Sequence, residues 1–368
     1  MMTMFKKTLL GAAITAATLV SGSANAAIQL AGDAVQVYGQ AAGFMTVIND
    51  SDSENSAGAV IESRIGFRGT VEFEDFAPNL IWQVESGDAN NNGAGAFGVR
   101  DTFVGLDFDG VGSFKFGRQL VAAYNYVDYP HTNPGLGNVF DWNNDLGVTF
   151  EDRADNNLRF DSANFGGFNF QATLSGMSTT TDAMVASIAT SYTQDLFSVH
   201  AAYYTRGEYT SLASEEPKYI INDQGQVVGN PKYVKGGATT THYANNYAIV
   251  GGSMFLGDVT LTAAYKMMET DTATGTNGQD AVSATAQYVL NNQWVFKAGY
   301  SMTTDADKDV LKGDGTVATK KEDTGDTAIT ARLGYLLPST YLYIDSRNYK
   351  IDNKDWTNSI LVGAEYYF

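Results

Sequence analysis

The last nine residues constrain the fold of this chain more than any other feature. Residues 360 to 368 end on an aromatic side chain, and apolar side chains stand at 360, 362, 364, 366 and 368. A period of two places all five on one face of a strand. In water such an edge strand would template aggregation, whereas in a closed sheet that faces lipid both of its edges are paired. We therefore expect a strand of a membrane-spanning β-barrel.

The N-terminal residues indicate export from the cytoplasm. Lys6 and Lys7 precede a short apolar stretch at 9–20, and the small residues Ala24-Asn25-Ala26 follow it. This order is typical of a secretory signal peptide, and we expect it to span residues 1–26. The apolar stretch is shorter than the roughly 18 residues that a transmembrane helix needs, and no later segment reaches that length.

Composition narrows the class of protein. The whole sequence has a formal net charge of −18, and removal of the leader takes away two lysines and no acid, so the mature surface should repel nucleic acid. No cysteine is present to form disulfides. The chain contains 38 glycines with 21 tyrosines, 20 phenylalanines and 4 tryptophans, a mixture that suits a wall with a wet inside and aromatic bands outside.

Alternation of polar and apolar residues, broken by Asn, Asp and Gly clusters, runs along residues 27–368. It predicts an all-β fold, a 16-stranded antiparallel transmembrane β-barrel in one domain. The expected strands are 34–47, 60–74, 79–87, 97–108, 113–119, 156–162, 168–177, 184–193, 197–207, 241–255, 259–269, 281–290, 293–303, 326–336, 340–350 and 357–368.

The links between these strands alternate in length. Short links lie at 109–112, 194–196, 256–258, 291–292 and 337–339, and long polar links lie at 48–59, 88–96, 120–155, 208–240 and 304–325. Short turns at one rim and long loops at the other are typical of outer-membrane barrels. Both termini fall on the short-turn rim, which we expect to face the periplasm.

The two faces of each strand differ in chemistry. In the strand at 259–269, Leu261 and Tyr265 alternate with Thr262 and Lys266, so the charged lysine lies on the polar face, opposite the apolar residues. One side of the sheet is therefore predicted to be wet. A barrel of roughly 16–18 strands leaves an aqueous channel, where about eight strands would be filled by side chains.

Several short motifs in this order resemble the trimeric general porins of Gram-negative outer membranes. They are Val37-Tyr38-Gly39-Gln40, Ser63-Arg64-Ile65-Gly66-Phe67-Arg68-Gly69, Gly112-Ser113-Phe114-Lys115-Phe116-Gly117-Arg118, Leu158-Arg159-Phe160 and the closing Tyr366-Tyr367-Phe368. The resemblance covers essentially the whole mature chain. It implies a homotrimer in contact with outer-membrane lipid and lipopolysaccharide.

The resemblance also implies a constriction in which the third long loop, here 120–155, folds into the barrel. Its aromatic and aliphatic residues, Tyr124, Tyr126, Tyr129, Leu136, Val139, Phe140, Trp142 and Leu146, are suited to packing against a wall. The basic side of the constriction would be Arg64, Arg118 and Arg159, with Gln40 where the family often has a lysine. Arg64 and Arg159 also point to the wet face by parity, whereas the alternation breaks down at Arg118.

The acidic side of the constriction matches the family less well. Relatives carry Pro-Glu-Phe-Gly-Gly, whereas this chain has Pro134-Gly135-Leu136-Gly137-Asn138, which keeps the turn and loses the acid. The opposing charge would come from Asp128, Asp141 or Asp145, each of which is equally compatible with ordinary loop solvation. His131 in the same loop is expected at the surface.

Together these features predict a passive pore for small hydrophilic solutes and ions in the outer membrane, with a mild preference for cations. No cofactor or metal site is expected, because the Asp305-Ala306-Asp307-Lys308-Asp309 run lacks the glycine and glutamate of a calcium loop. Only three histidines exist and none has an adjacent Asp, so an enzyme is not expected. The alternatives are a barrel-anchored surface receptor or adhesin and a solute-specific porin.

Overall fold

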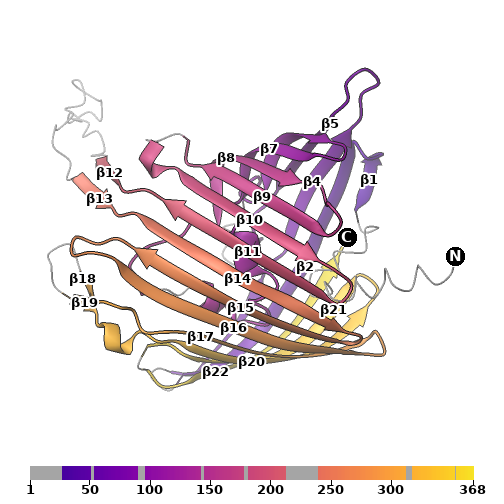
Figure 1. Ribbon diagram of the computed structural model, residues 1–368. Coiled ribbons are helices and arrows are strands. Elements are labelled where there is room, and N and C mark those ends of the chain that lie inside the picture. The colour runs from indigo at the N-terminus through magenta and orange to yellow at the C-terminus, as the bar shows by residue number, and fades with distance from the viewer. Residues whose placement is uncertain are drawn as a thin grey trace, which may run out of the picture.

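The computed structural model describes residues 27–50, 54–89, 96–141, 145–177, 181–212, 239–311, 317–352 and 354–368. The expected signal peptide lies outside these residues, as does Trp142. The chain forms one antiparallel sheet that closes on itself, because β2 pairs with β22 through Gln40–Asn49 and Asn358–Tyr367 (Figure 1). The predicted 16-stranded barrel is confirmed.

The wall consists of sixteen strands when β3 and β4 are counted as two halves of one. In chain order they are β2 (Val35–Asn49), β3 (Ser56–Ile61) with β4 (Arg64–Val71), β5 (Asn79–Glu85), β6 (Thr102–Phe108), β7 (Gly112–Leu120), β8 (Arg153–Ser162), β9 (Phe168–Ser175), β10 (Val185–Thr193), β11 (Phe197–Arg206), β14 (Asn245–Leu256), β15 (Val259–Thr270), β16 (Asn277–Leu290), β17 (Trp294–Thr303), β20 (Thr327–Leu337), β21 (Thr340–Lys350) and β22 (Thr357–Tyr367).

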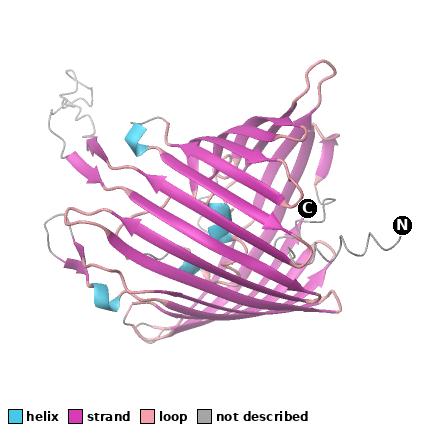
Figure 2. Ribbon diagram, in the orientation of Figure 1, coloured by secondary structure: helices cyan, strands magenta, loops and turns pink. Residues whose placement is uncertain are grey.

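The remaining elements are not strands of this wall. β1 (Ile28–Ala31) pairs with the start of β2, and two hairpins extend the long loops: β12 (Tyr209–Leu212) with β13 (Thr239–His242), and β18 (Val310–Leu311) with β19 (Val317–Thr319). Helical turns are few, namely α2 (Tyr124–Asp128), α3 (Gly137–Phe140), η1 (Thr181–Ala183) and η2 (Lys321–Asp323), drawn in cyan in Figure 2. In the part of the chain that is described, we find no helix with the length and apolar character required for crossing a bilayer.

Side chains alternate between the two faces of the wall as the sequence predicts. On β15, Leu261, Tyr265 and Met267 are exposed, whereas the intervening Thr262 and Lys266 are buried. On β22, Ile360, Val362 and Tyr366 are likewise exposed. Apolar residues thus cover the outside of the barrel, where lipid replaces water, and polar residues cover the inside.

Many expected strands have ends that differ from the observed ones, and three of these differences have a clear local cause. The fourth begins at Thr102 rather than Phe97, because the positive φ of Gly98 turns the chain and the Arg100 N–H donates to the Glu85 carbonyl. The tenth begins at Asn245, since 241 and 242 belong to β13. The second is interrupted at 62–63, where the Ser63 hydroxyl accepts the N–H of Ala42 at 3.1 Å in place of a backbone carbonyl.

Candidate functional site

The described parts of the loop that joins β7 to β8, residues 121–141 and 145–152, pack against inward-facing side chains of the wall. Its α2 and α3 are seen through the strands of the front wall in Figure 2. Val121, Val127 and Phe140 are buried in one apolar cluster with Tyr204 of β11 and Tyr247 of β14. Leu136 and Val139 form a second cluster with Ala328 of β20. Burial of these apolar groups holds the loop to the wall.

Hydrogen bonds tie the loop backbone to four regions of the wall. Those at its start run from the N–H of Ala122 to Thr173 Oγ1 at 3.0 Å and from the N–H of Ala123 to Ser187 Oγ at 2.9 Å. Further along, Ser283 Oγ donates to the His131 carbonyl at 2.7 Å, and Tyr349 OH donates to the Gly135 carbonyl at 2.7 Å. The loop backbone therefore satisfies its polar groups on the wall rather than in bulk water.

The turn at Pro134-Gly135 touches β21. Pro134 is buried, and Gly135 has a φ of +66°. A Cβ on Gly135 would lie 2.5 Å from Cδ of Arg347. Both the backbone conformation and the close approach therefore require glycine at this position.

His131 is fully buried, and the expectation of a surface residue was wrong. Its Nε2 lies 2.9 Å from Nε2 of His200 on β11, and the ring of Tyr126 stacks on His200 at 4.5 Å. Burial, with His200 and Lys297 nearby, lowers the pKa of His131 to about 3. The ring is therefore neutral at physiological pH and acts as a packing group with one hydrogen bond to the wall.

The three expected loop acids have different surroundings. Asp128 is exposed and accepts a bond from Thr132 Oγ1 at 3.0 Å. Asp141 accepts a bond from Tyr124 OH at 2.8 Å, and burial raises its pKa to about 7. Asp145 accepts a bond from Gln279 of β16 at 3.1 Å, and burial raises its pKa to about 6. Of these three acids, Asp128 is therefore the one whose carboxylate is exposed to water.

A small cavity of ≈ 150 Å³ separates the loop from β14 and β15. It is lined by Asp141 and Asp152 of the loop and by Tyr247 and Lys266 of the wall, among others. Lys266 Nζ donates to the Asp141 carbonyl oxygen at 3.2 Å, and burial raises the pKa of Asp152 to about 6. The sequence places Lys266 on the wet face, but nothing in it indicates that Asp152 would meet it.

Arg64 and Arg159 each pair with an acid on their own side of the barrel. Arg64 Nε forms an ion pair with Asp88, which follows β5. Arg159 binds Asp161 with its Nη2 at 2.8 Å and also donates to the carbonyl of Leu120 at 3.0 Å. These pairings place counter-charges within hydrogen-bonding distance of both arginines.

Arg118 and Gln40 have separate surroundings. Arg118 pairs with Asp155 at 3.1 Å and donates to the Val99 carbonyl at 2.6 Å, beside a bulge between β7 and β8. Gln40 donates to the Glu62 carbonyl at 3.1 Å. Among the described residues, none of the three arginines is hydrogen-bonded to Asp128, Asp141 or Asp145, so the structure does not join the two expected sides of the constriction directly.

A second charged cluster lies on the inner face of β20 and β21. Asp345 pairs with Arg347, two residues further along β21, at 2.8 Å. Sequence reasoning missed its third member, Arg332, whose Nε and Nη2 donate to the two oxygens of Asp345 at 2.6 and 2.7 Å. The cross-strand register of Arg332 with Asp345 would have indicated the pair, but register is set by the turn at 338–339.

The geometry defines a class of protein: a transmembrane β-barrel whose inner wall is polar and whose lumen carries an inward-packed loop. A model of the Gram-negative porin family matches residues 12–355. The chain belongs to the Gram-negative porin family. Members of this family are channels, so the protein forms a channel in the outer membrane, as the sequence predicted.

Individual relatives agree with this assignment. Chitoporin of Vibrio furnissii is 31% identical over 389 residues, which cover 99% of each chain. Outer membrane porin F of Escherichia coli K12 is 31% identical over 153 residues, 39% of this chain and 42% of that protein.

Solved structures share the fold at low identity. The anion-selective porin from Comamonas acidovorans has a TM-score of 0.68 and 17% identity, over 91% of this chain and 99% of that one. Salmonella typhi OmpF in complex with daunomycin has a TM-score of 0.64 and 20% identity, over 93% and 100%. The likeness to these two structures concerns the fold alone.

Proposed function

We propose that small hydrophilic solutes and ions diffuse passively along the side of the lumen formed by β2 to β8, beside the inward-packed loop. One observation carries the proposal: the two sides of the lumen differ in exposure. The inward-facing residues of β15, β16 and β17 that meet the loop, such as Lys266, Ser283 and Ser301, are buried behind it, whereas the Arg64 side chain on β4 is 28% exposed. Wall residues that the loop covers cannot line a solute route, whereas wall residues that it leaves in contact with water can.

Residues 120–155 act as the constriction in this proposal, with Arg64, Arg159 and Gln40 on the facing wall. Asp88 and Asp161 lie on the same side of the barrel as Arg64 and Arg159 and pair with them. Their negative charges weaken the transverse electric field that such a constriction would otherwise have. The acidic surface then decides the sign of selectivity, because fixed negative charge at the mouths concentrates cations. In this proposal Arg118 contributes to the charge of the pore only near its mouth, where the carboxylate of Asp155 screens it.

Reversal potentials in planar bilayers under a salt gradient test the route and its charge preference. Purified protein should conduct KCl and give a potential of the sign expected for mild cation preference. A folded barrel that carries no current would refute the channel route. A potential directed toward anions would refute the assigned role of the acidic mouths while leaving the route intact.

The signal peptide and the orientation are parts of the same proposal. Residues 1–26 direct export, and residues 27–368 form the barrel with both termini in the periplasm. The support is geometric: Phe368 exchanges backbone hydrogen bonds with Gly39 near β1, on the rim of the short turns (Figure 1). Protease added to intact cells should cut the long loops and spare a tag at the C-terminus. Cleavage of that tag would overturn the orientation.

A second candidate is a channel specific for chitooligosaccharides. It is favoured by the full-length likeness to chitoporin. Two part-buried tyrosines also favour it, because their hydroxyls donate to carboxylates: Tyr38 to Glu85 at 2.7 Å and Tyr124 to Asp141 at 2.8 Å. An aromatic ring beside an acid suits a sugar, since the ring can pack on its apolar face and the acid can bind its hydroxyl groups. Micromolar chitohexaose should then interrupt the KCl current, and maltohexaose should not. Equal effects of the two sugars would leave passive diffusion as the function.

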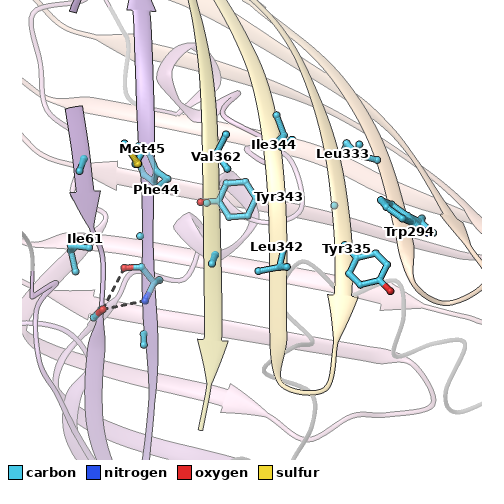
Figure 3. Close-up of a pocket in the computed structure, with 18 residues that line it drawn as sticks. Phe44, Met45, Ile61, Trp294, Leu333, Tyr335, Leu342, Tyr343, Ile344 and Val362 are labelled. Atoms are coloured by element: carbon cyan, nitrogen blue, oxygen red, sulfur yellow. Dashed lines mark hydrogen bonds between the residues drawn. The ribbon is translucent and has the colours of Figure 1, made fainter. Parts of the chain in front are cut away.

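We further propose assembly into homotrimers within lipid and lipopolysaccharide. The outer wall has an apolar hollow of ≈ 770 Å³ between β3 and β17, where Ala41, Ala59 and Ala364 lie among larger exposed residues such as Met45 and Ile344 (Figure 3). Small residues allow a neighbouring barrel to approach closely. Met45→Lys should convert heat-sensitive oligomers on gels into monomers. An unchanged oligomer would place the contact elsewhere.

A further inference from the structure

One lysine of the inner wall has no partner. Lys297 of β17 faces inward and is 8% exposed. Among the described residues it makes no hydrogen bond and no ion pair, and its electrostatic neighbours are Arg332, which repels it, and Asp345, which attracts it. A buried amine without a partner acid is costly to protonate, so an anion from outside the chain would stabilise its charged form at this position.

The strands on either side of β17 supply further hydrogen-bond donors at the same level along the strands. Cross-strand pairing aligns Gln287 of β16 with Lys297, and Lys297 with Arg332 of β20. All three face inward and are nearly buried. Adjacent strands lie roughly 4.8 Å apart, which lets the long side chains of these three residues reach one carboxylate or phosphate group.

The local charge balance is positive. Asp345 is the acid in contact with this row, and its two oxygens already accept bonds from Arg332 and Arg347. The next inward carboxylate, Glu365 on β22, is bonded to the hydroxyl of Tyr367. Three basic side chains therefore share one fully engaged acid, and no described acid is bonded to Lys297.

We propose that Lys297, Arg332 and Gln287 form a binding site for small oxyanions, carboxylate or phosphate, on the lumen face of β16, β17 and β20. The Lys297 ammonium supplies the charge, and the row of N–H groups supplies bonds to two or three oxygens. An anion that crosses the channel is held here before it leaves. The site rests on the proposed function only in that the lumen admits the anion.

Inorganic phosphate is the probe that tests the site. In planar bilayers at constant KCl, phosphate should lower the chloride current of the natural protein in a saturable way. Lys297→Gln should weaken this block at least tenfold, and Lys297→Arg should restore it to within a few-fold. Lys354→Gln removes the same charge from an exposed loop and should leave the block unchanged.

Three results would overturn the site: no saturable effect in the natural protein, equal block in Lys297→Gln, or equal loss in Lys354→Gln. Calorimetric titration of the detergent-solubilised barrel with phosphate provides a readout without current. If the natural protein gives a heat of phosphate binding that Lys297→Gln lacks, the site is supported even when the barrel carries no current. If the natural protein conducts but gives no heat of phosphate binding, the site is refuted. Failure of the site and failure of the channel are thereby separated.

Discussion

Neutralising Asp345 should destabilise the barrel strongly. Its carboxylate is 0% exposed and accepts N–H bonds from Arg332 at 2.6 and 2.7 Å and from Arg347 at 3.1 and 2.8 Å. Asp345→Asn keeps the shape of the side chain and removes its charge. The Arg332 guanidinium, whose side chain is 4% exposed, then becomes an uncompensated buried cation.

The expected magnitude follows from this burial. Breaking a buried ion pair from one side costs about 3–5 kcal/mol. The Arg347 side chain is 21% exposed and regains water, so we expect the lower part of that range, about 3–4 kcal/mol. Since 1.4 kcal/mol is a factor of ten, the folding equilibrium constant should fall by roughly two to three orders of magnitude.

Guanidinium unfolding of the barrel in detergent micelles, followed by tryptophan fluorescence, measures this loss. The matched control is Asp155→Asn, which breaks the pair with Arg118. The Asp155 side chain is 72% exposed, and exposed pairs contribute about 0–1 kcal/mol. Equal losses in the two variants would refute the reasoning, because burial would then not set the cost.

Three further predictions concern the loop and the wall. Gly135→Ala should destabilise packing of the loop against β21 by about 1–3 kcal/mol and raise the rate of amide hydrogen exchange in the loop. Gly257 also has a positive φ, +69°, but open space around the position of a Cβ, so Gly257→Ala should show only the cost of the backbone conformation. Equal effects of the two variants would exclude the contact with Arg347. Burial raises the pKa of Asp141 to about 7, so docking of the loop should weaken as pH rises from about 4 to 7 and current noise should grow. Asp141→Asn should reduce that dependence and leave the part due to Asp145 and Asp152, whose pKa values burial also raises, to about 6; an unchanged dependence would contradict the assignment. Arg64→Gln should shift the reversal potential further toward cations than Arg159→Gln, whose guanidinium is more buried, and the opposite order would contradict the proposed route.

The sequence predicted the barrel well because one rule, alternation of the side chains of a strand between lipid and lumen, applies to every strand. The strand at 340–350 coincides with β21 for this reason. The predicted ends failed where a local feature outweighed the pattern. At Gly98 a positive φ turns the chain, and at Ser63 a hydroxyl replaces a backbone acceptor.

The contacts of the lumen were harder to predict, since they join residues far apart in the chain. His131 meets His200, 69 positions away, and Arg64 meets Asp88, 24 positions away. Parity gives the face on which a side chain lies but not its partner across the lumen. The arginines were therefore placed on the inner wall, while Asp88 and Asp161, which bind them, were not foreseen.

Cysteine accessibility tests the central claim most directly, because the natural chain contains no cysteine. Single variants Arg64→Cys, Thr285→Cys and Val362→Cys are treated with a charged methanethiosulfonate reagent while current is recorded. Arg64→Cys should lose conductance, whereas Thr285→Cys, behind the loop, and Val362→Cys, on the lipid face, should not. Equal loss at Thr285→Cys, or no loss at Arg64→Cys, would contradict a water-filled route along β2 to β8.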